Sequence, residues 1–246
     1  MRNNPVTYCM PVCLFLFVLA FSFAPAPGQT VFDLLARYEL ATGFSSRLKV
    51  KTLTSIGTIT QMGSTLPISI IQKRPDKYRF DVHLEEGRIT QAYDGKAGWT
   101  FNPFTMTDTM TLEGSELAQI RESADFDGML HTYKSKGYTI SLVGKVLTGL
   151  HNAYKIQVKK PSGEVLSFYL DAVTYLVIRT ESELLVNGMR YTAESIFGDF
   201  RKTGGMMLPY YIQSRNGNLI TEIRIDTVRI NETMEDYYFL AGKTRH

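Results

Sequence analysis

The sequence predicts a mainly β protein, in which one antiparallel sheet of about eleven strands carries a few short helices. Three observations predict it: hydrophobic residues recur with a period of two along much of the chain, turn-forming residues separate the segments that show this period, and the period breaks between residues 101 and 138. Successive side chains of a strand point to opposite faces. Segments with one apolar and one polar side are therefore typical of antiparallel sheets with one face in water.

The first 28 residues differ in composition from the rest of the chain. Arg2 is their only charged side chain, an apolar run extends from Pro11 to Phe23, and only Ala, Pro and Gly occupy 24–28. A cationic start, an apolar stretch and a small-residue exit are the parts of a secretory signal peptide. A retained membrane anchor is the alternative, but the run is short beside the roughly 20 residues that cross a bilayer. We expect cleavage after Gly28 and an exported, soluble domain at 29–246.

The composition of this mature chain excludes several classes of function. Both cysteines, Cys9 and Cys13, precede the expected cleavage site, so the mature chain has no disulfide, thiolate nucleophile or cysteine metal site. It carries 26 Lys and Arg residues against 24 Asp and Glu. This balance is atypical of a nucleic-acid-binding protein, in which a basic face dominates.

The mature chain is expected to begin with an amphipathic helix at 31–41. Thr30 is a suitable N-cap, Asp33 lies near the positive end of the helix dipole, and Gly43 can end the helix. The apolar face is formed by residues at helical spacing: Val31, Leu34, Leu35 and Tyr38. The helix should therefore pack against an apolar surface.

The clearest strand is Tyr78–Leu84, where every second residue is apolar and the others are charged or polar. The same alternation recurs in Leu66–Ile70, Tyr138–Leu142, Tyr154–Lys159 and Ile223–Asp226. Turn chemistry separates such segments, as at Asp94–Gly95 and Asn216–Gly217. Pro67 and Pro209 have no amide hydrogen to give to a ladder, so their strands are expected at an edge or at a bulge.

Two short helices are expected where the period breaks, one at Ser115–Glu122 and one at Phe126–Tyr133. Leu117 and Ile120 share a helical face in the first, and Phe126 shares one with Leu130 in the second. The sequence shows no internal repeat, linker or low-complexity segment. A single domain at 29–246 is therefore the simplest organisation.

Catalytic and metal-binding patterns are missing from the sequence. The four histidines, at 83, 131, 151 and 246, lack the spacing to one another and to carboxylates that metal sites favour. Asp125 and Asp127 flank Phe126, but helix-start and turn roles explain them. Neither a GxSxG motif nor a phosphate-binding loop is present. We expect no enzyme activity, no metal and no cofactor.

Apolar residues exceed what the covering of one sheet requires. The mature chain has eight methionines: Met62, Met106, Met110, Met129, Met189, Met206, Met207 and Met234. Met adapts to irregular apolar shapes, so such a set favours a ligand pocket between sheet and helices, although ordinary core filling is the alternative.

Two neighbouring segments carry a family resemblance. Residues 74–80 (RPDKYRF) resemble the Arg-Pro-x-x-aromatic turn of LolA-type lipoprotein carriers, and residues 93–104 (YDGKAGWTFNPF) resemble the strand and loop that follow it in those proteins. Three further stretches, at 124–128, 169–176 and 200–210, are similar to the broader outer membrane lipoprotein-sorting family. The resemblance covers nearly the whole mature chain.

This resemblance implies an incomplete, strongly curved antiparallel β-barrel that short helices close as a lid. Its cavity would accept acyl chains of a lipoprotein or lipid in the periplasm, with an inner-membrane donor and an outer-membrane acceptor as partners and a monomeric carrier. Arg74 stands where the carriers have the arginine that bonds to the lid. Tyr78 stands where they have a phenylalanine that handles cargo. A binder or sensor of another hydrophobic molecule of the cell envelope is the alternative.

The alternation also predicts the residues of the cavity. Ile68 and Ile70 should share a face along one strand, and Tyr78, Phe80 and Val82 along the next. Trp99 and Phe101 should likewise share a face. We expect most of these to line the concave side and to meet lid residues Leu117, Ile120, Met129 and Leu130. The alternative is a filled core with no room for a guest.

Overall fold

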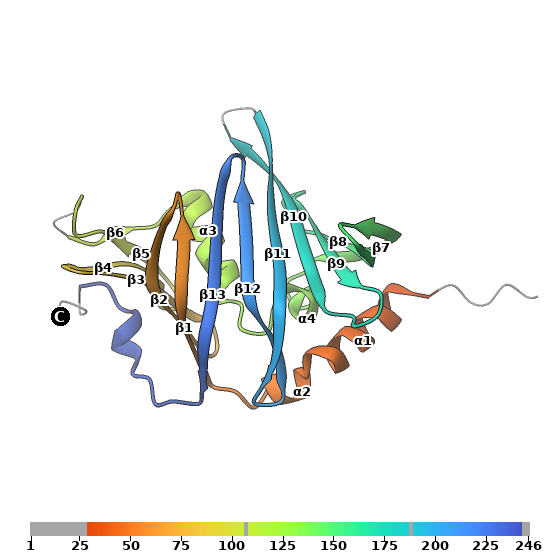
Figure 1. Ribbon diagram of the computed structural model, residues 1–246, viewed down its shortest axis with the longest axis horizontal. Helices are drawn as coiled ribbons and strands as arrows, with labels where there is room; N and C mark the ends of the chain where they lie inside the picture. Colours follow the sequence, from red (N-terminus) through yellow and green to blue (C-terminus); the bar gives the residue numbers. More distant parts are fainter. Residues whose placement is uncertain (1–28, 106–107, 187–188, 243–246) are drawn as a thin grey trace, which may run out of the picture.

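The computed structural model describes residues 29–105, 108–186 and 189–242. The expected signal segment at 1–28 lies outside these residues. The described part forms one curved antiparallel sheet of thirteen strands with a few short helices (Figure 1). The strands are β1 (Thr52–Gln61), β2 (Ser64–Lys73), β3 (Lys77–Leu84), β4 (Gly87–Tyr93), β5 (Gly98–Phe101), β6 (Met110–Thr111), β7 (Thr139–Thr148), β8 (His151–Lys159), β9 (Val165–Asp171), β10 (Val177–Val186), β11 (Met189–Thr203), β12 (Met206–Asn216) and β13 (Leu219–Ile230).

The strand order is β6-β5-β4-β3-β2-β1-β13-β12-β11-β10-β9-β8-β7, so the first and last strands of the chain pair in the middle. In that pairing Leu53 of β1 lies opposite Ile230 of β13. β6 and β7 are the two edges, and the sheet is not closed into a barrel. The predicted class, a strongly curved antiparallel sheet with helices, is confirmed, with two strands more than expected. One strand, β6, has only two residues, too few to show a period in the sequence.

In the part of the chain that the structure describes, five helical elements accompany the sheet: α1 (Val31–Thr42), α2 (Phe44–Arg47), α3 (Gly114–Ala124), α4 (Met129–Thr132) and the 3₁₀ helix η1 (Asp236–Phe239). We call the face of the sheet that packs against α1, α3 and α4 the inner face, and the opposite face the outer face. Among the described residues, none of the helices combines the length and the apolar character that crossing a bilayer would need.

Helix α1 forms as expected, and its ends show why. The Thr30 side chain accepts a hydrogen bond from the Asp33 amide, and Asp33 accepts one from the Thr30 amide, which together make a capping box. At the other end Gly43 takes the left-handed conformation, with φ at 68°. A Cβ at Gly43 would lie 2.0 Å from the Gly205 carbonyl oxygen, so glycine is required there for the close approach of α1 to the turn before β12.

Neither proline marks an edge strand, which corrects that expectation, because β2 and β12 both lie inside the sheet. Each proline nevertheless pairs with only one of the two neighbouring strands and lies outside the pairing with the other. Pro67 pairs with β1, but the ladder from β2 to β3 begins at Ile68. Pro209 pairs with β11, but the ladder from β12 to β13 begins at Tyr211. The missing amide hydrogen therefore costs no bond to that neighbouring strand.

Candidate functional site: an apolar hollow on the inner face

The five predicted residues of β2 and β3 lie on the inner face. Ile68 pairs with Val82 and Ile70 with Phe80, and directly opposed residues of an antiparallel pair point to the same side. Tyr78 belongs to the same face of β3 and packs against the cluster that holds α3. These side chains therefore face the helices, as expected.

Burial along β3 is the reverse of what its sequence suggests. The side chains at the polar positions of the strand are almost inaccessible, with 1% of Arg79 and 3% of Asp81 exposed. The side chains at the apolar positions, Phe80 and Val82, are only half-buried. A strand that packs against a filled core buries its apolar side more completely than its polar side. The inner face is thus left partly uncovered where β3 crosses it.

The polar residues of β3 are buried because the C-terminal segment covers the outer face. Arg79 donates through Nη1 to the Tyr238 carbonyl oxygen at 2.6 Å and pairs through Nε with Asp81 at 2.7 Å. Thr90 donates to Asp81 at 2.5 Å, and Phe239 is fully buried. Every partner of this ion pair comes from the outer face, so the pair fixes η1 to the sheet.

Trp99 and Phe101 share a face, but it is the outer one, so the expectation that they line the concave side with β2 and β3 is wrong. Trp99 pairs with Ala92, and Phe101 pairs with Thr90. The Trp99 indole donates to the Phe239 carbonyl oxygen at 2.7 Å, beneath the C-terminal segment.

Gly98 explains this placement. It pairs with Tyr93 on the inner face, directly under α3. A Cβ at Gly98 would lie 3.1 Å from Leu117 Cδ1 and 3.2 Å from Ile120 Cγ2. The helix therefore packs on a position without a side chain, and the bulky residue that follows points to the other face.

The predicted lid residues divide between two apolar clusters. Leu117 and Ile120 of α3 pack with Tyr78 and Tyr93 at the β3–β5 side. Leu130 and Met129 of α4 instead belong to a cluster around β8 and β9, formed with Leu34, Leu35, Ile156, Val158 and Leu170. The structure thus brings α3 to the predicted cavity residues but holds α4 elsewhere.

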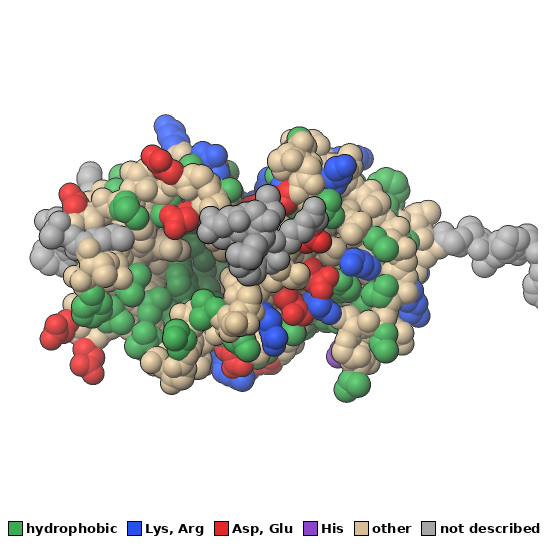
Figure 2. All heavy atoms as spheres, turned by 90° about the horizontal axis from the view of Figure 1, so that it is seen from above, with side chains coloured by type: hydrophobic (Ala, Val, Ile, Leu, Met, Phe, Trp, Pro, Cys, Tyr) green, Lys and Arg blue, Asp and Glu red, His purple; other side chains and the backbone are tan. Residues whose placement is uncertain are grey.

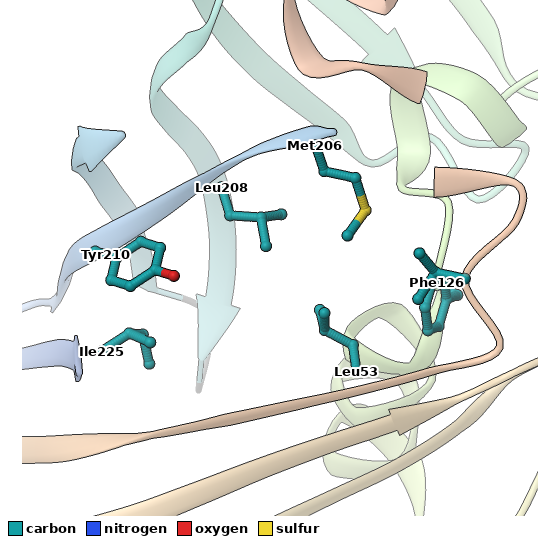
Figure 3. Close-up of a cluster of buried hydrophobic side chains, with 7 residues drawn as sticks. Leu53, Phe126, Met206, Leu208, Tyr210 and Ile225 are labelled. Carbon is teal, nitrogen blue, oxygen red and sulfur yellow. The ribbon is translucent and has the colours of Figure 1, made fainter. Parts of the chain in front are cut away.

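A third cluster lies between these two and was not predicted as a unit. Phe126, in the loop between α3 and α4, lies at one end of a buried cluster with Leu53, Met206, Leu208, Tyr210 and Ile225 (Figure 3). The sequence placed Phe126 on a helical face, and it gave no sign that β12 and β13 would lie opposite.

Arg74 holds the α3–α4 loop, as predicted. Its Nη1 and Nη2 donate to the Asp127 carboxylate at 2.8 and 2.5 Å, and Nε donates to the Val50 carbonyl oxygen at 2.7 Å. The guanidinium also lies over the Phe126 ring, 4.4 Å from its centre. The hydrogen bond from Arg74 lowers the pKa of Asp127 below its ordinary value, against the effect of burial. We call this contact between Arg74, Phe126 and Asp127 the latch.

Helices α1, α2 and α4 support the latch. Arg47 donates to the Phe126 carbonyl oxygen at 2.7 Å, and its own carbonyl oxygen accepts from Arg74 at 3.0 Å. His131 of α4 stacks on Phe44 of α2 with ring centres 3.6 Å apart. Burial lowers the pKa of His131, although Glu39 beside it acts in the opposite direction. Three helices thus converge on one loop.

The uncovered part of the inner face forms a hollow. Figure 2, which looks from above in the view of Figure 1, shows hydrophobic side chains gathered in a recess on the side of β1 to β5 and α3. By the strand registers, the half-buried apolar residues of the inner face there are Ile59, Leu66, Ile70, Phe80, Val82, Leu84, Ile89, Ile212 and Ile223. We call this surface the hollow. It presents apolar side chains that the helices leave partly exposed.

The Tyr78 hydroxyl lies on the inner face at the α3 side of the hollow, and Ser55 and Gln91, opposite Ile70 and Phe80, add further polar groups to this face. Burial raises the pKa of Tyr78 to about 12, so the phenol is neutral at physiological pH. Within the described ranges, no group of three or more His, Asp and Glu side chains is placed to hold a metal ion. The arrangement is suited to binding an apolar molecule with at most a hydrogen bond to its polar part.

Comparison of the sequence with protein-family models gives no match, and comparison with curated proteins gives none either. Solved structures do match. A LolA superfamily protein from Nitrosomonas europaea superposes with a TM-score of 0.55 at 12% identity, covering 86% of this chain and 97% of the other. A putative outer membrane lipoprotein-sorting protein domain from Vibrio parahaemolyticus gives 0.57 at 12% identity, with coverage of 82% and 95%.

A DUF1329 family protein from Desulfovibrio piger also matches, with a TM-score of 0.52 at 14% identity and coverage of 84% and 97%. Identities this low leave the fold as the common feature. The curved, open sheet with short helices on its inner face is therefore the fold of LolA superfamily proteins.

Proposed function

We propose that this protein is an exported carrier that binds the acyl chains of a lipoprotein or lipid in the hollow. The observation that carries the proposal is the reversed burial along β3. Phe80 and Val82 are half-buried, whereas Arg79 and Asp81 are inaccessible. Leaving apolar surface in contact with water costs about 25 cal/mol per Å², so an acyl chain that covers the hollow gains that free energy.

The latch supplies the means of regulating access. It joins the strand turn at Arg74 to the loop that carries α3 and α4, and α3 borders the hollow. Breaking the ion pair would free α3 to move away from Gly98 and enlarge the space. Delivery from an inner-membrane donor to an outer-membrane acceptor, by a monomer in the periplasm, belongs to the same proposal and rests on the resemblance at 74–80 and 93–104.

Binding of a different hydrophobic molecule of the cell envelope is the second candidate, and the Tyr78 hydroxyl favours it. No other group of the described residues hydrogen-bonds to this hydroxyl, which lies on the inner face beside Phe80. The carriers that the sequence resembles have phenylalanine there. A ligand with a hydrogen-bonding group near its apolar body would use the tyrosine, whereas an acyl chain would not.

Native mass spectrometry of the protein purified from its own host separates these candidates. A carrier of acyl chains retains species whose masses correspond to fatty acids, phospholipids or a lipoprotein. Retention of a single non-acyl compound would support the second candidate, and a ligand-free protein in every preparation would contradict both.

A charge placed in the hollow tests the site itself. Phe80→Glu is expected to leave the protein folded, because water reaches this position, and to weaken binding of a fluorescent fatty-acid probe by at least about tenfold. Thr227→Glu is the matched control, since Thr227 is exposed on the outer face of β13. If the inner face were a filled core, Phe80→Glu would lower the free energy of unfolding by about 3 kcal/mol or more. Val82→Glu should behave as Phe80→Glu does.

A further inference from the structure

The sheet splits on the far side of the molecule from the hollow. β10 pairs with β11 only as far as Arg179 opposite Ile196, and β10 then follows β9, with Val177 opposite Leu170. β11 continues to Thr203 paired with β12 alone. Figure 1 shows β10 and β11 diverging toward α1. We call the space between them the fork.

An open pocket of about 910 Å³, lined mainly by apolar side chains, lies at the fork. Leu176 and Ile178 line it from one arm, Ile196 and Phe200 from the other, and Met207 from β12. Its volume lies in the range of about 300–1,000 Å³ that small-molecule sites occupy. The solvent-facing side of an antiparallel sheet usually carries polar side chains, so an apolar lining on the outer face is unexpected.

The fork pocket is separate from the hollow because it opens on the outer face. Arg179, in its lining, pairs with Tyr169. The neighbouring residue of β9, Phe168, packs in the cluster on the inner face. Successive residues of a strand point to opposite sides, so the sheet itself divides the two spaces.

Among the described residues of the lining, the one arginine, Arg179, is already engaged. Its Nη1 donates to Thr148 Oγ1 at 2.9 Å, its Nη2 donates to Glu181, and its Nε lies 2.7 Å from Glu194 Oε1 in an ion pair without hydrogen-bond geometry. With two carboxylates on one guanidinium, Arg179 has no face left for an anionic ligand.

The second charged pair of the lining adds negative charge. Asp171 accepts from the amides of Val173 and Thr174 at 3.0 and 2.8 Å, and the His151 ring lies 3.1 Å away. Burial raises the pKa of Asp171, but the hydrogen bonds from Thr174, Val173 and His151 together lower it below its ordinary value. Asp171 is therefore ionised at neutral pH. With Glu194 it gives the lining two carboxylates against the single guanidinium of Arg179.

We propose that the fork pocket binds an amphiphile with an apolar body and a cationic amine head. The apolar arms accept the body, and the excess of carboxylates over guanidinium groups in the lining attracts the amine. A carboxylate or phosphate head would face Asp171 and Glu194 with no free guanidinium to compensate. The site does not depend on the hollow or on its proposed cargo.

Three ligands with the same ten-carbon chain test the proposal: decylamine, 1-decanol and decanoate. Each is titrated into the purified protein, and isoleucine methyl groups are followed by NMR. Ile178 and Ile196 report on the fork, and Ile70 and Ile89 on the hollow. Decylamine is expected to shift the fork methyls saturably, with decanoate weaker there by at least about tenfold.

Ile196→Arg should abolish the decylamine shifts at Ile178, since it removes an apolar contact and adds a cation. The matched control is Thr192→Arg, an exposed position four residues earlier on the same face of β11, which should leave them unchanged. Phe80→Glu should also leave them unchanged, which keeps this test independent of the hollow.

Several outcomes would overturn the proposal. If decanoate or decanol bound at the fork as tightly as decylamine, the pocket would not select a cationic head group. Shifts confined to Ile70 and Ile89 would show that the ligands bind in the hollow and not at the fork. Retention of decylamine by Ile196→Arg would show that the amine does not bind in the fork pocket.

Discussion

The two halves of the sheet use their inner faces differently. Around β8 and β9 the inner residues Ile156, Val158 and Leu170 are fully buried beneath α1 and α4. Along β3 their counterparts Phe80 and Val82 are half-buried. The first half therefore fills its inner face, whereas along β3 the more complete burial lies on the outer face, under the C-terminal segment. A domain can keep a ligand surface uncovered when stability is supplied from the opposite side of the same strands.

The largest effect is expected at the buried ion pair of the outer face. Arg79→Met leaves the Asp81 carboxylate buried without its partner, which should lower the free energy of unfolding by about 3–5 kcal/mol. Urea unfolding measures it, and Trp99, the only tryptophan of the sequence, reports directly on the C-terminal segment. The double variant Arg79→Met with Asp81→Leu should recover much of the loss. A loss below 1 kcal/mol would mean that the outer face does not stabilise this half.

Truncations on the inner face compare the two halves directly. Leu170→Ala should cost about 2–5 kcal/mol, because the fully buried side chain leaves a cavity. Val82→Ala removes less material from a half-buried position and should cost under about 1 kcal/mol. Chemical denaturation of both variants gives the difference. Equal losses, scaled for the atoms removed, would erase the distinction between a filled and an open half.

The latch should contribute a smaller amount. Arg74→Leu removes hydrogen bonds to a charged group, worth about 1.5–3 kcal/mol, while the sheet persists. Hydrogen exchange should accelerate in α3 and the following loop, and release of a bound probe should change with it. Unchanged exchange together with unchanged release would show that Arg74 does not control the lid.

The latch should also weaken in acid. The pKa of Asp127 lies below its ordinary value of 3.8, so the carboxylate contributes fully at neutral pH, and its contribution is lost as the pH falls through the lowered pKa. Exchange in α3 should therefore rise below about pH 4 in the parent and not in Arg74→Leu.

The smallest effect is expected at Tyr78. Tyr78→Phe removes a hydroxyl without a hydrogen-bond partner among the described residues, so stability should change by less than about 1 kcal/mol. Affinity for a fatty-acid probe should stay the same or increase slightly. A clear loss of affinity would point instead to a ligand that hydrogen-bonds to the phenol.

Local patterns predicted the local structure well. Thr30, Asp33 and Gly43 specify α1 through contacts within a few residues, and the alternation in 78–84 specifies β3 and its faces. The contact of Arg74 with the helical insertion was predicted from the resemblance and is present in the structure.

What the sequence did not reveal depends on residues far apart in the chain. Trp99 was assigned to the wrong face because its partner, Phe239, lies 140 positions away and covers the outer side. The period of two identifies the members of each face, but not which face the helices cover. Gly98, packed under α3, was the local signal that could have decided it.

The pairing of β1 with β13 has a consequence for the order of folding. Leu53 and Ile230 lie opposite each other in the middle of the sheet, yet almost the whole domain separates them in sequence. The hairpins of each half can form from neighbouring residues, whereas the join between the halves must wait for the last strand. A chain truncated within 219–230 would keep most of its local hairpins and lose the connection that makes them one sheet. The centre of the sheet is therefore the one strand pairing that needs both ends of the domain.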